Sequence, residues 1–395
     1  MSNQKIYGAN IVLPDRVLFD GTVVIAENRI EQVYEGRPTR TDSSDIDVNG
    51  AWVLPGMIDT HSDAIEVEVE PRPGSLFPLE MSFYELEKKL VSEGVTTIYH
   101  AVALMDEQAK SWIRSLNHAL ETIEKIKQLA EGTHLIRHRT HLRYEIANTT
   151  AAAHVKQLIE ARQIDQLSFM DHSPGQGQYR DIEQHKTFLR EHRHFSEEEI
   201  SEVIERGKTQ EKLNPFVLQD IAAAAAKQGI PLASHDDDSF EKLEDVASWN
   251  AQISEFPITL EVAKRAKEKG MYVVAGAPNV MLGKSHNNNL SAMEAIKEGA
   301  VDILCSDYSP PSMLHSVFKL FHHGISMEEA VRMVTLNPAK ALGIASELGS
   351  IEAGKLADLL IVGEEQKRPF LQSVFVNGRE ACRMNYQIRN TVPSQ

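Results

Sequence analysis

Short apolar runs alternate with polar, helix-like stretches along most of this 395-residue chain. Between about residues 54 and 343, eight apolar runs of strand length alternate with segments whose apolar residues recur at helical spacing. The expected strands are 54–60, 95–103, 133–143, 165–171, 230–235, 254–258, 271–276 and 301–306. The expected helices include 82–93, 108–131, 216–228, 240–252, 259–269, 291–298, 313–322 and 326–335. We also expect the very polar region 181–212 to be helical, as an elaboration over one face.

The alternation of strands and helices predicts an α/β fold, a (β/α)8 TIM-like barrel whose chemistry lies at the carboxyl ends of the strands. An open, doubly wound sheet is the alternative. Both ends of the chain differ from the middle, since they contain β-branched runs separated by turns such as Asp-Gly and Asn-Gly. We therefore predict a barrel over 55–343 and a small composite β-sandwich domain built from 1–54 and 344–395.

Charge and cysteine content exclude several classes of protein. The net charge is −16, from 57 acidic and 41 basic residues, which repels nucleic acid and anionic membranes. Two cysteines are too few for a disulfide framework or a thiolate zinc site. No apolar run approaches the ~18 residues of a membrane span, and the first residues lack the apolar region of a signal peptide. We expect a cytoplasmic protein that binds neither nucleic acid nor membrane.

Imidazole and carboxylate groups follow five of the predicted strands. The residues are His61, Asp63, Glu145, His172, His235 and Asp307. Three histidines and three carboxylates form a nitrogen–oxygen ligand set that suits Zn, Mn or Fe and is sufficient for two ions. A single histidine or aspartate at a strand end is more often structural, and Asp307 could simply cap the turn before Pro310. Five such strand ends in barrel register favour a site for one or two divalent metal ions, with zinc as the first candidate.

Two motifs near the ends of the predicted barrel resemble those of the amidohydrolase superfamily. "VLPGMIDTHSD" is similar to its first barrel strand, with Asp63 in place of the usual second histidine, and "GSIEAGKLADLLIV" is similar to its return to the small β-domain. The resemblance implies metal ligation by His61, Asp63, His172 and His235. It also implies that Asp307 is the catalytic residue, which binds metal and moves a proton, and that Glu145 takes the place of a bridging glutamate.

Five further segments resemble one family within that superfamily. They are "EPRPG", "DHSPGQGQYRD", "SHDDDS", "GAPNVMLGKSHNNN" and "CSDYSPPSML". Together they are similar to the alpha-D-ribose 1-methylphosphonate 5-triphosphate diphosphatases of the bacterial carbon–phosphorus lyase pathway. That resemblance implies a phosphorylated sugar as substrate and pyrophosphate release during phosphonate catabolism. A homodimer and association with other proteins of the pathway are further expectations.

Phosphate chemistry also requires cationic side chains near the metal. Arg143, Arg180, Lys284 and His286 are the candidates for substrate binding, because they lie beside the predicted ligands and because guanidinium and ammonium groups bind phosphate. Each of them could equally be an ordinary surface residue. Two alternatives are a carbon–nitrogen amidohydrolase or deaminase on the same metal frame, and a non-catalytic scaffold. The scaffold would be expected to have lost metal ligands, whereas every expected position holds a competent donor.

Overall fold

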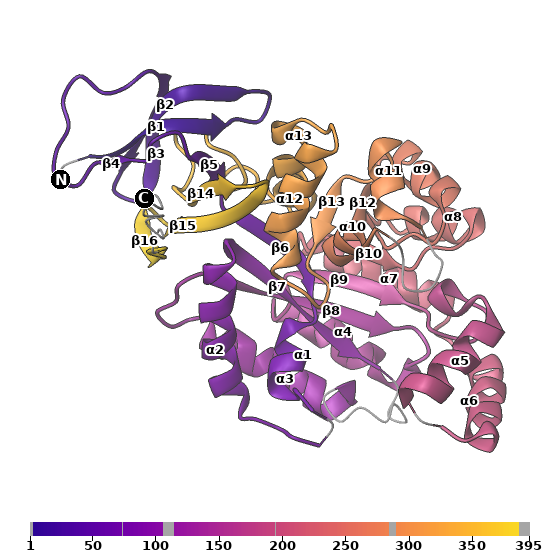
Figure 1. Cartoon of the computed structure of the whole chain (residues 1–395). Helices are drawn as coiled ribbons and strands as arrows, with labels where there is room; N and C mark the ends of the chain where they lie inside the picture. The colour runs from indigo at the N-terminus through magenta and orange to yellow at the C-terminus, as the bar shows by residue number, and fades with distance from the viewer. Residues whose placement is uncertain (1–2, 73, 106–113, 194, 284–289, 387–395) are drawn as a thin grey trace, which may run out of the picture.

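A computed structural model describes residues 3–72, 74–105, 114–193, 195–283 and 290–386. It contains a barrel of parallel strands and a separate mixed sheet made from both ends of the chain (Figure 1). The barrel strands are β6 (Met57–Ser62), β7 (Val95–Leu104), β8 (Arg137–Glu145), β9 (Gln166–Met170), β10 (Leu232–His235), β11 (Ile253–Glu255), β12 (Tyr272–Gly276) and β13 (Ile303–Cys305). Each expected strand is present, and each pairs in parallel with the next along the chain.

The first and last barrel strands, β6 and β13, come together at their carboxyl ends. Ser62 forms a parallel bridge with Asp307. The amide of Asp63 donates to the carbonyl of Asp307 at 2.7 Å, and the amide of Asp307 donates to the carbonyl of His61 at 3.0 Å. The barrel is therefore nearly closed, the predicted fold class is confirmed, and the open-sheet alternative is wrong. This closure also places the last predicted site residue beside the first two.

Helices connect the barrel strands and cover their outer faces. They are α1 (Ala64–Val69), α2 (Leu79–Ser92), α3 (Leu116–Leu129), α4 (Ala152–Glu160), α5 (Ile182–Arg193), α6 (Glu197–Thr209), α7 (Pro215–Lys227), α8 (Phe240–Ser248), α9 (Leu260–Glu268), α10 (Ala277–Leu282), α11 (Ala292–Lys297), α12 (Ser312–His322), α13 (Met327–Arg332) and α14 (Leu336–Ala341). The sequence did not predict α1, α4, α10 and α14, which have six or nine residues, although it did predict other helices of these lengths, such as α8 and α13. The start of the helix expected over 108–131 falls on 106–113, outside the described residues.

Helices α5 and α6 occupy the polar region 181–212 and project at one corner of the barrel (Figure 1). They share a small core of Leu189, Ile200 and Ile204, apart from the main core of the barrel. Ser196 and Glu199 form a capping box at the start of α6, which satisfies backbone amides there. The helical prediction for this region is correct.

The second sheet joins the two ends of the chain. Its strands are β1 (Gln4–Val12), β2 (Val17–Ala26), β3 (Arg29–Glu35), β4 (Ile46–Asp47), β5 (Trp52–Pro55), β14 (Leu359–Glu365), β15 (Arg368–Val376) and β16 (Arg379–Arg383). Strand β5 lies between β1 and β14, and Gly56 alone separates it from β6. Trp52 packs edge-on against Phe318 and Phe321 of α12, and Arg137 of β8 forms an ion pair with Asp358. These contacts fix the sheet against the barrel. Among the described residues, no helix has the length and apolar character needed to cross a membrane.

One half-buried acid beside the barrel gives a prediction about stability. Glu93 follows α2, and burial together with the nearby charge of Asp59 raises its pKa to about 7. The folded chain therefore binds a proton at Glu93 more tightly than the unfolded chain, so this residue lowers stability as the pH rises from about 4.5 to about 7. We expect Glu93→Gln to raise the free energy of unfolding by about 1–2 kcal/mol at pH 8, after allowance for solvent screening.

The measurement is the thermal unfolding midpoint at pH ~4.5 and at pH 8. The variant should differ from the wild type only at the higher pH. Glu80→Gln, at an exposed position of the same helix, is the matched control and should leave both midpoints unchanged. If the midpoint of Glu93→Gln changes between the two pH values as much as that of the wild type, another group causes the pH dependence of stability.

Candidate metal centre

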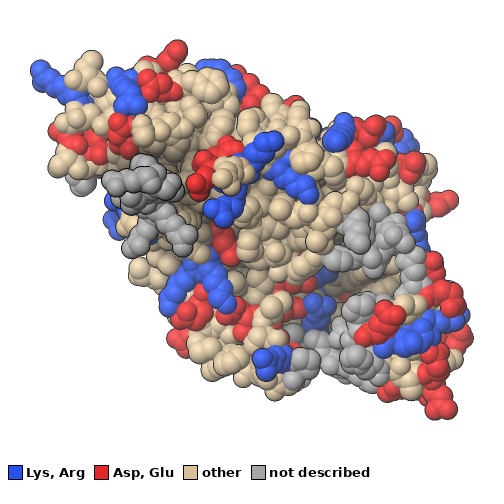
Figure 2. Space-filling model, in the orientation of Figure 1, with Lys and Arg blue, Asp and Glu red and all other residues tan. Residues whose placement is uncertain are grey.

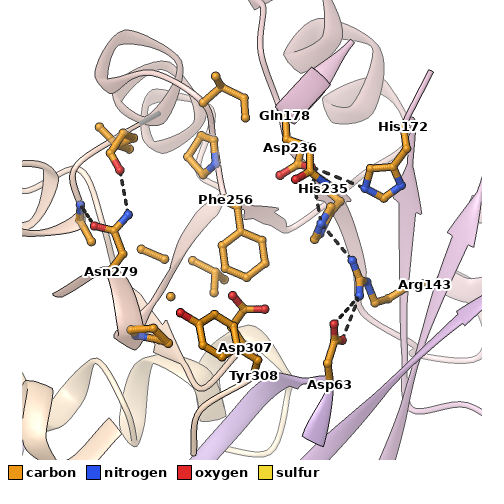
Figure 3. Close-up of a pocket in the computed structure, with 18 of the residues that line it drawn as sticks. Asp63, Arg143, His172, Gln178, His235, Asp236, Phe256, Asn279, Asp307 and Tyr308 are labelled. Atoms are coloured by element: carbon orange, nitrogen blue, oxygen red, sulfur yellow. Dashed lines mark hydrogen bonds and ion pairs between the residues drawn. The ribbon is translucent and has the colours of Figure 1, made fainter. Parts of the chain in front are cut away.

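A cavity of about 620 Å³ opens at the carboxyl ends of the barrel strands. Four of the six predicted ligands line it, namely Asp63, His172, His235 and Asp307. His61 is 1% exposed and lies just beneath, at the end of β6, with its ring 5.4 Å from the ring of His235. Figure 3 shows Arg143 between Asp63 and His235. The barrel thus brings together side chains that are up to 246 positions apart in the sequence, as Asp307 and His61 are.

Glu255 at the end of β11 orients two of the histidines. One of its carboxylate oxygens lies 3.2 Å from Nδ1 of His61, and the other lies 3.3 Å from Nδ1 of His235. With both Nδ1 protons donated to this carboxylate, the Nε2 atoms of the two rings keep their lone pairs. Hydrogen bonds of this kind are the usual way of fixing the tautomer of a metal-binding histidine.

The environment also keeps these imidazoles neutral. Burial, together with the charge of Arg143, lowers the pKa of His61 to about 4. The same two causes hold the pKa of His235 well below its usual value. Neutral imidazole is the form that binds metal ions. The electrostatics of the pocket therefore suit both rings to metal binding near neutral pH.

Asp236, His172 and His235 form a group of side chains that could hold a metal ion. Asp236 was not among the predicted ligands. Its Oδ2 is buried and accepts no hydrogen bond from the described residues. The same oxygen lies 3.7 Å from Nε2 of His172 and 3.8 Å from Nε2 of His235. A buried carboxylate oxygen without a donor is costly, and a cation bound to it removes that cost. The donors here fit a divalent metal ion of the kind that the family resemblance implies.

Glu145 ends β8 and supports His172 from behind. Its carboxylate lies 2.8 Å from Nδ1 of His172 and accepts the backbone amide of the same residue at 3.2 Å. The proton of Nδ1 is thus directed to Glu145, and Nε2 of His172 faces Asp236. The role of Glu145 as a bridging ligand stays a prediction, whereas its contact with His172 is present in the structure.

Asp307 has an unusual backbone conformation for a residue other than glycine. Its φ is 55°, and Asp236 has a φ of 53°. Left-handed conformations of this kind are uncommon and tend to be kept at functional sites. Burial and the nearby charge of Asp63 raise the pKa of Asp307 to about 6. The site therefore holds an acid whose affinity for a proton is higher than that of an ordinary aspartate.

The four predicted substrate-binding residues fall in different places. Arg143 lines the cavity, donates to Asp63 at 2.9 Å and contacts Nε2 of His235 at 3.2 Å. Arg180 is exposed and does not line the cavity, while Lys284 and His286 lie outside the described residues. Arg114, which the sequence did not single out, also lines the cavity and pairs with Glu66 and Asp63.

The contacts of Glu255 predict a measurable effect on metal binding. Glutamine can accept from only one of the two histidines and presents an amide to the other, so Glu255→Gln should leave one ring without its partner. We expect the affinity for the metal to fall about 10–100-fold, the usual cost of losing a group that orients a ligand. The measurement is a competition titration against a chelator. Glu298→Gln, on the protein surface, should bind metal as the wild type does.

Known proteins resemble this chain along most of its length. The relatives include alpha-D-ribose 1-methylphosphonate 5-triphosphate diphosphatase of Escherichia coli (strain K12), which is 30% identical over 95% of this chain and 99% of its own. They also include a 5'-deoxyadenosine deaminase of Methanosarcina acetivorans, which is 26% identical over 91% of this chain and 82% of its own. The crystal structure of a D-hydantoinase has a TM-score of 0.65 at 14% identity, covers 97% of this chain and 95% of its own, and supports the fold.

The amidohydrolase family profile matches residues 52–381, which run from β5 through the whole barrel to β16. The match includes every predicted metal ligand and, in the terminal sheet, β5, β14, β15 and the start of β16. It agrees with the resemblance found in the sequence motifs and with the nearly closed barrel. The chain belongs to the amidohydrolase family.

Proposed function

We propose that the chain is a metal-dependent hydrolase that releases pyrophosphate from alpha-D-ribose 1-methylphosphonate 5-triphosphate. The observation that carries the proposal is the 30% identity to the Escherichia coli diphosphatase, which extends over 95% of this chain. In this reaction the oxygen of water forms a bond to the α-phosphorus. The bond from that phosphorus to the oxygen shared with the β-phosphate breaks, pyrophosphate leaves, and a ribose 5-phosphate remains.

The side chains that would hold the metal line one wall of the cavity or lie directly beneath it. They are His61, Asp63, His172, His235, Asp236 and Asp307, with Glu145 directly behind His172. When bound, the ion supplies a Lewis acid and lowers the pKa of water towards ~7. We propose zinc as this ion, with manganese or iron as the alternatives, because imidazole and carboxylate ligands suit all three.

Asp307 is the proposed proton acceptor. Its carboxylate faces the cavity, and its backbone is fixed to His61 and Asp63 by the hydrogen bonds that close the barrel. A carboxylate in this position can take a proton from the attacking water and pass it to a departing group. The backbone pairing matters for this role, because it holds the acceptor at a constant place relative to the metal ligands.

Arg143 has two roles in the proposal. Its guanidinium donates to Asp63 and contacts His235, which holds those two side chains in position. The same group lines the cavity, where it can donate to phosphate oxygens. Arg114 lines the cavity beside it, and its pairing with Glu66 fixes its direction.

The charge balance of the cavity also supports a metal-dependent reaction. Three aspartates and two arginines line it. A triphosphate carries several negative charges and would be repelled unless cations offset the carboxylates. On the face shown in Figure 2, acidic and basic side chains are interspersed. The net charge of −16 offers no long-range attraction for an anion, so the binding energy must come from local contacts in the pocket.

The test is a phosphorus NMR assay of the metal-loaded protein with the ribose 5-triphosphate. The expected result is the appearance of pyrophosphate together with a ribose 5-phosphate. Release of orthophosphate alone would contradict the proposed bond cleavage. The same assay with a nucleoside 5'-triphosphate measures whether the group at C1 of the ribose affects the rate.

A carbon–nitrogen amidohydrolase or deaminase is the second candidate. The relative named 5'-deoxyadenosine deaminase, 26% identical over 91% of this chain, favours it. Its test is the release of ammonia from an aminopurine nucleoside by the same protein sample. Ammonia release without pyrophosphate release would replace the first proposal by the second. The two arginines in the cavity support the phosphate substrate over a neutral nucleoside.

The proposal extends to the setting of the protein. We propose that the enzyme is cytoplasmic and that it binds the phosphorylated sugar as its substrate. We also propose that it acts as a homodimer and associates with other proteins of phosphonate catabolism. Sedimentation of the purified protein tests the dimer. Co-purification from cells grown on a phosphonate tests the association.

A further inference from the structure

A second group of potential metal ligands lies on the outer wall of the barrel. It consists of Glu87 of α2, His134 just before β8, and His138 on β8. Side chains alternate along a strand, so His138 points away from the barrel interior, whereas His141 and Arg143 point into it. His134 precedes the amino-terminal end of β8, and the cavity lies at the opposite end. This group is therefore separate from the candidate metal centre.

His134 is held in a form that presents a lone pair to Glu87. Its Nε2 lies 2.6 Å from the carbonyl oxygen of Leu129, which can only accept, so Nε2 carries a proton. The neutral ring then has a lone pair at Nδ1, which lies 3.4 Å from Oε1 of Glu87. This Nδ1 is buried and has no hydrogen-bond partner among the described residues, and the side chain is 8% exposed. The buried Nδ1 of His134 therefore lacks a donor, and a cation or a proton between this atom and Glu87 would supply the missing interaction.

His138 differs from His134, because its Nε2 lies within hydrogen-bond distance of Glu87, and the tautomer of the ring decides whether this nitrogen donates to the carboxylate or keeps a lone pair. Nε2 of His138 lies 3.4 Å from the same oxygen of Glu87, and Nδ1 of His138 lies 2.9 Å from Nε2 of His100. The contact with His100 can fix the tautomer in which Nε2 of His138 is free to bind. Ligand atoms on a tetrahedral zinc ion, with bonds of ~2.0–2.1 Å, lie roughly 3.3–3.4 Å apart. The distances from Oε1 of Glu87 to Nδ1 of His134 and to Nε2 of His138, both 3.4 Å, match this separation between two ligand atoms.

The surroundings fix the three side chains in place. Phe83 lies one helical turn before Glu87 on α2, and its ring is 4.2 Å from the ring of His138. Oε1 of Glu87 also accepts the backbone amides of Leu135 and Ile136, at 2.5 and 3.2 Å. Glu87 and His138 are each at least nine-tenths buried. A rigid, enclosed set of one carboxylate and two imidazoles is typical of a bound transition metal.

We propose that Glu87, His134 and His138 form a second, structural zinc site that ties α2 and the start of β8 together. Three side chains leave a fourth position, which a water or the second oxygen of Glu87 can take. The competing occupant is a proton on His134, which would make an imidazolium–carboxylate pair with Glu87. This inference does not depend on the proposed function, because it concerns the number of bound ions and not the reaction.

The experiment counts metal ions in the full-length protein. The wild type, Glu87→Gln and His134→Gln are stripped with a chelator, titrated with Zn²⁺ alone, and analysed by elemental mass spectrometry. Glu87→Gln keeps an acceptor for the backbone amides, and His134→Gln keeps a donor for the Leu129 carbonyl, so both variants should fold. His154→Ala, at an exposed position of α4, is the matched control.

We expect both variants to bind one zinc ion fewer than the wild type and the control. A titration with Co²⁺ alone should show the same difference. The two variants should lack the part of the visible absorption that comes from Co²⁺ bound at this site. The thermal midpoint of the wild type should rise further with Zn²⁺ than that of Glu87→Gln. Equal zinc content in the wild type and both variants would overturn the proposal. It would indicate that a protonated His134 forms an ion pair with Glu87 in place of a bound metal.

Discussion

Replacing Asp307 by asparagine is expected to lower kcat about 10²–10⁴-fold while most of the metal and the substrate remain bound, the usual scale for loss of a general base. Asparagine keeps the size and one coordinating oxygen but cannot accept the proton. It also tolerates the left-handed backbone, with φ of 55°, that Asp307 adopts. The loss should therefore be chemical and not the result of misfolding.

The measurement is kcat for pyrophosphate release in protein whose metal content has been determined. Asp245→Asn, at an exposed position of α8, is the matched control and should have the kcat of the wild type. A metal-loaded Asp307→Asn protein with kcat close to that of the wild type would place the base on another side chain.

Replacing His235 by alanine should remove metal and activity together. His235 is in contact with groups on three sides, since it lies beside Glu255, Arg143 and Asp236. Its loss removes a nitrogen donor and leaves Arg143 facing the space that the ring occupied. We expect the metal affinity to fall by more than the ~10–100-fold that follows loss of a merely orienting group.

Metal content and kcat are both measured after dialysis against a weak chelator. His323→Ala, on the exposed end of α12, serves as the control for a lost histidine. If His235→Ala retains the metal content of the wild type, His235 is not a ligand, and the group formed with His172 and Asp236 does not bind the ion.

The fold could be predicted from the sequence because the pattern of apolar runs is local information. All eight barrel strands lie within a few residues of their predicted positions. Most of the candidate site could also be predicted, because barrel chemistry lies at strand ends and the polar residues there are few. Asp63, His172, His235 and Asp307 line one cavity, as this reasoning requires.

The residues that were missed depend on contacts that are not local. Glu255 ends a strand of three residues, too short for an acid within it to stand out, and its partners lie on β6 and β10. Asp236 is one of three consecutive aspartates, and the left-handed backbone at this position decides which of them faces His172.

The terminal sheet has a consequence for synthesis of the chain on the ribosome. Strand β5 is bonded on one side to β1 and on the other to β14, whose first residue follows about 300 positions later. At ~5–20 residues per second, one edge of the nascent sheet stays unpaired for roughly 15–60 s, while the whole barrel is being made. An exposed strand edge of that kind can pair with other chains. The side of β5 that later pairs with β14 is therefore open to pairing with other chains until the last part of the protein has been made.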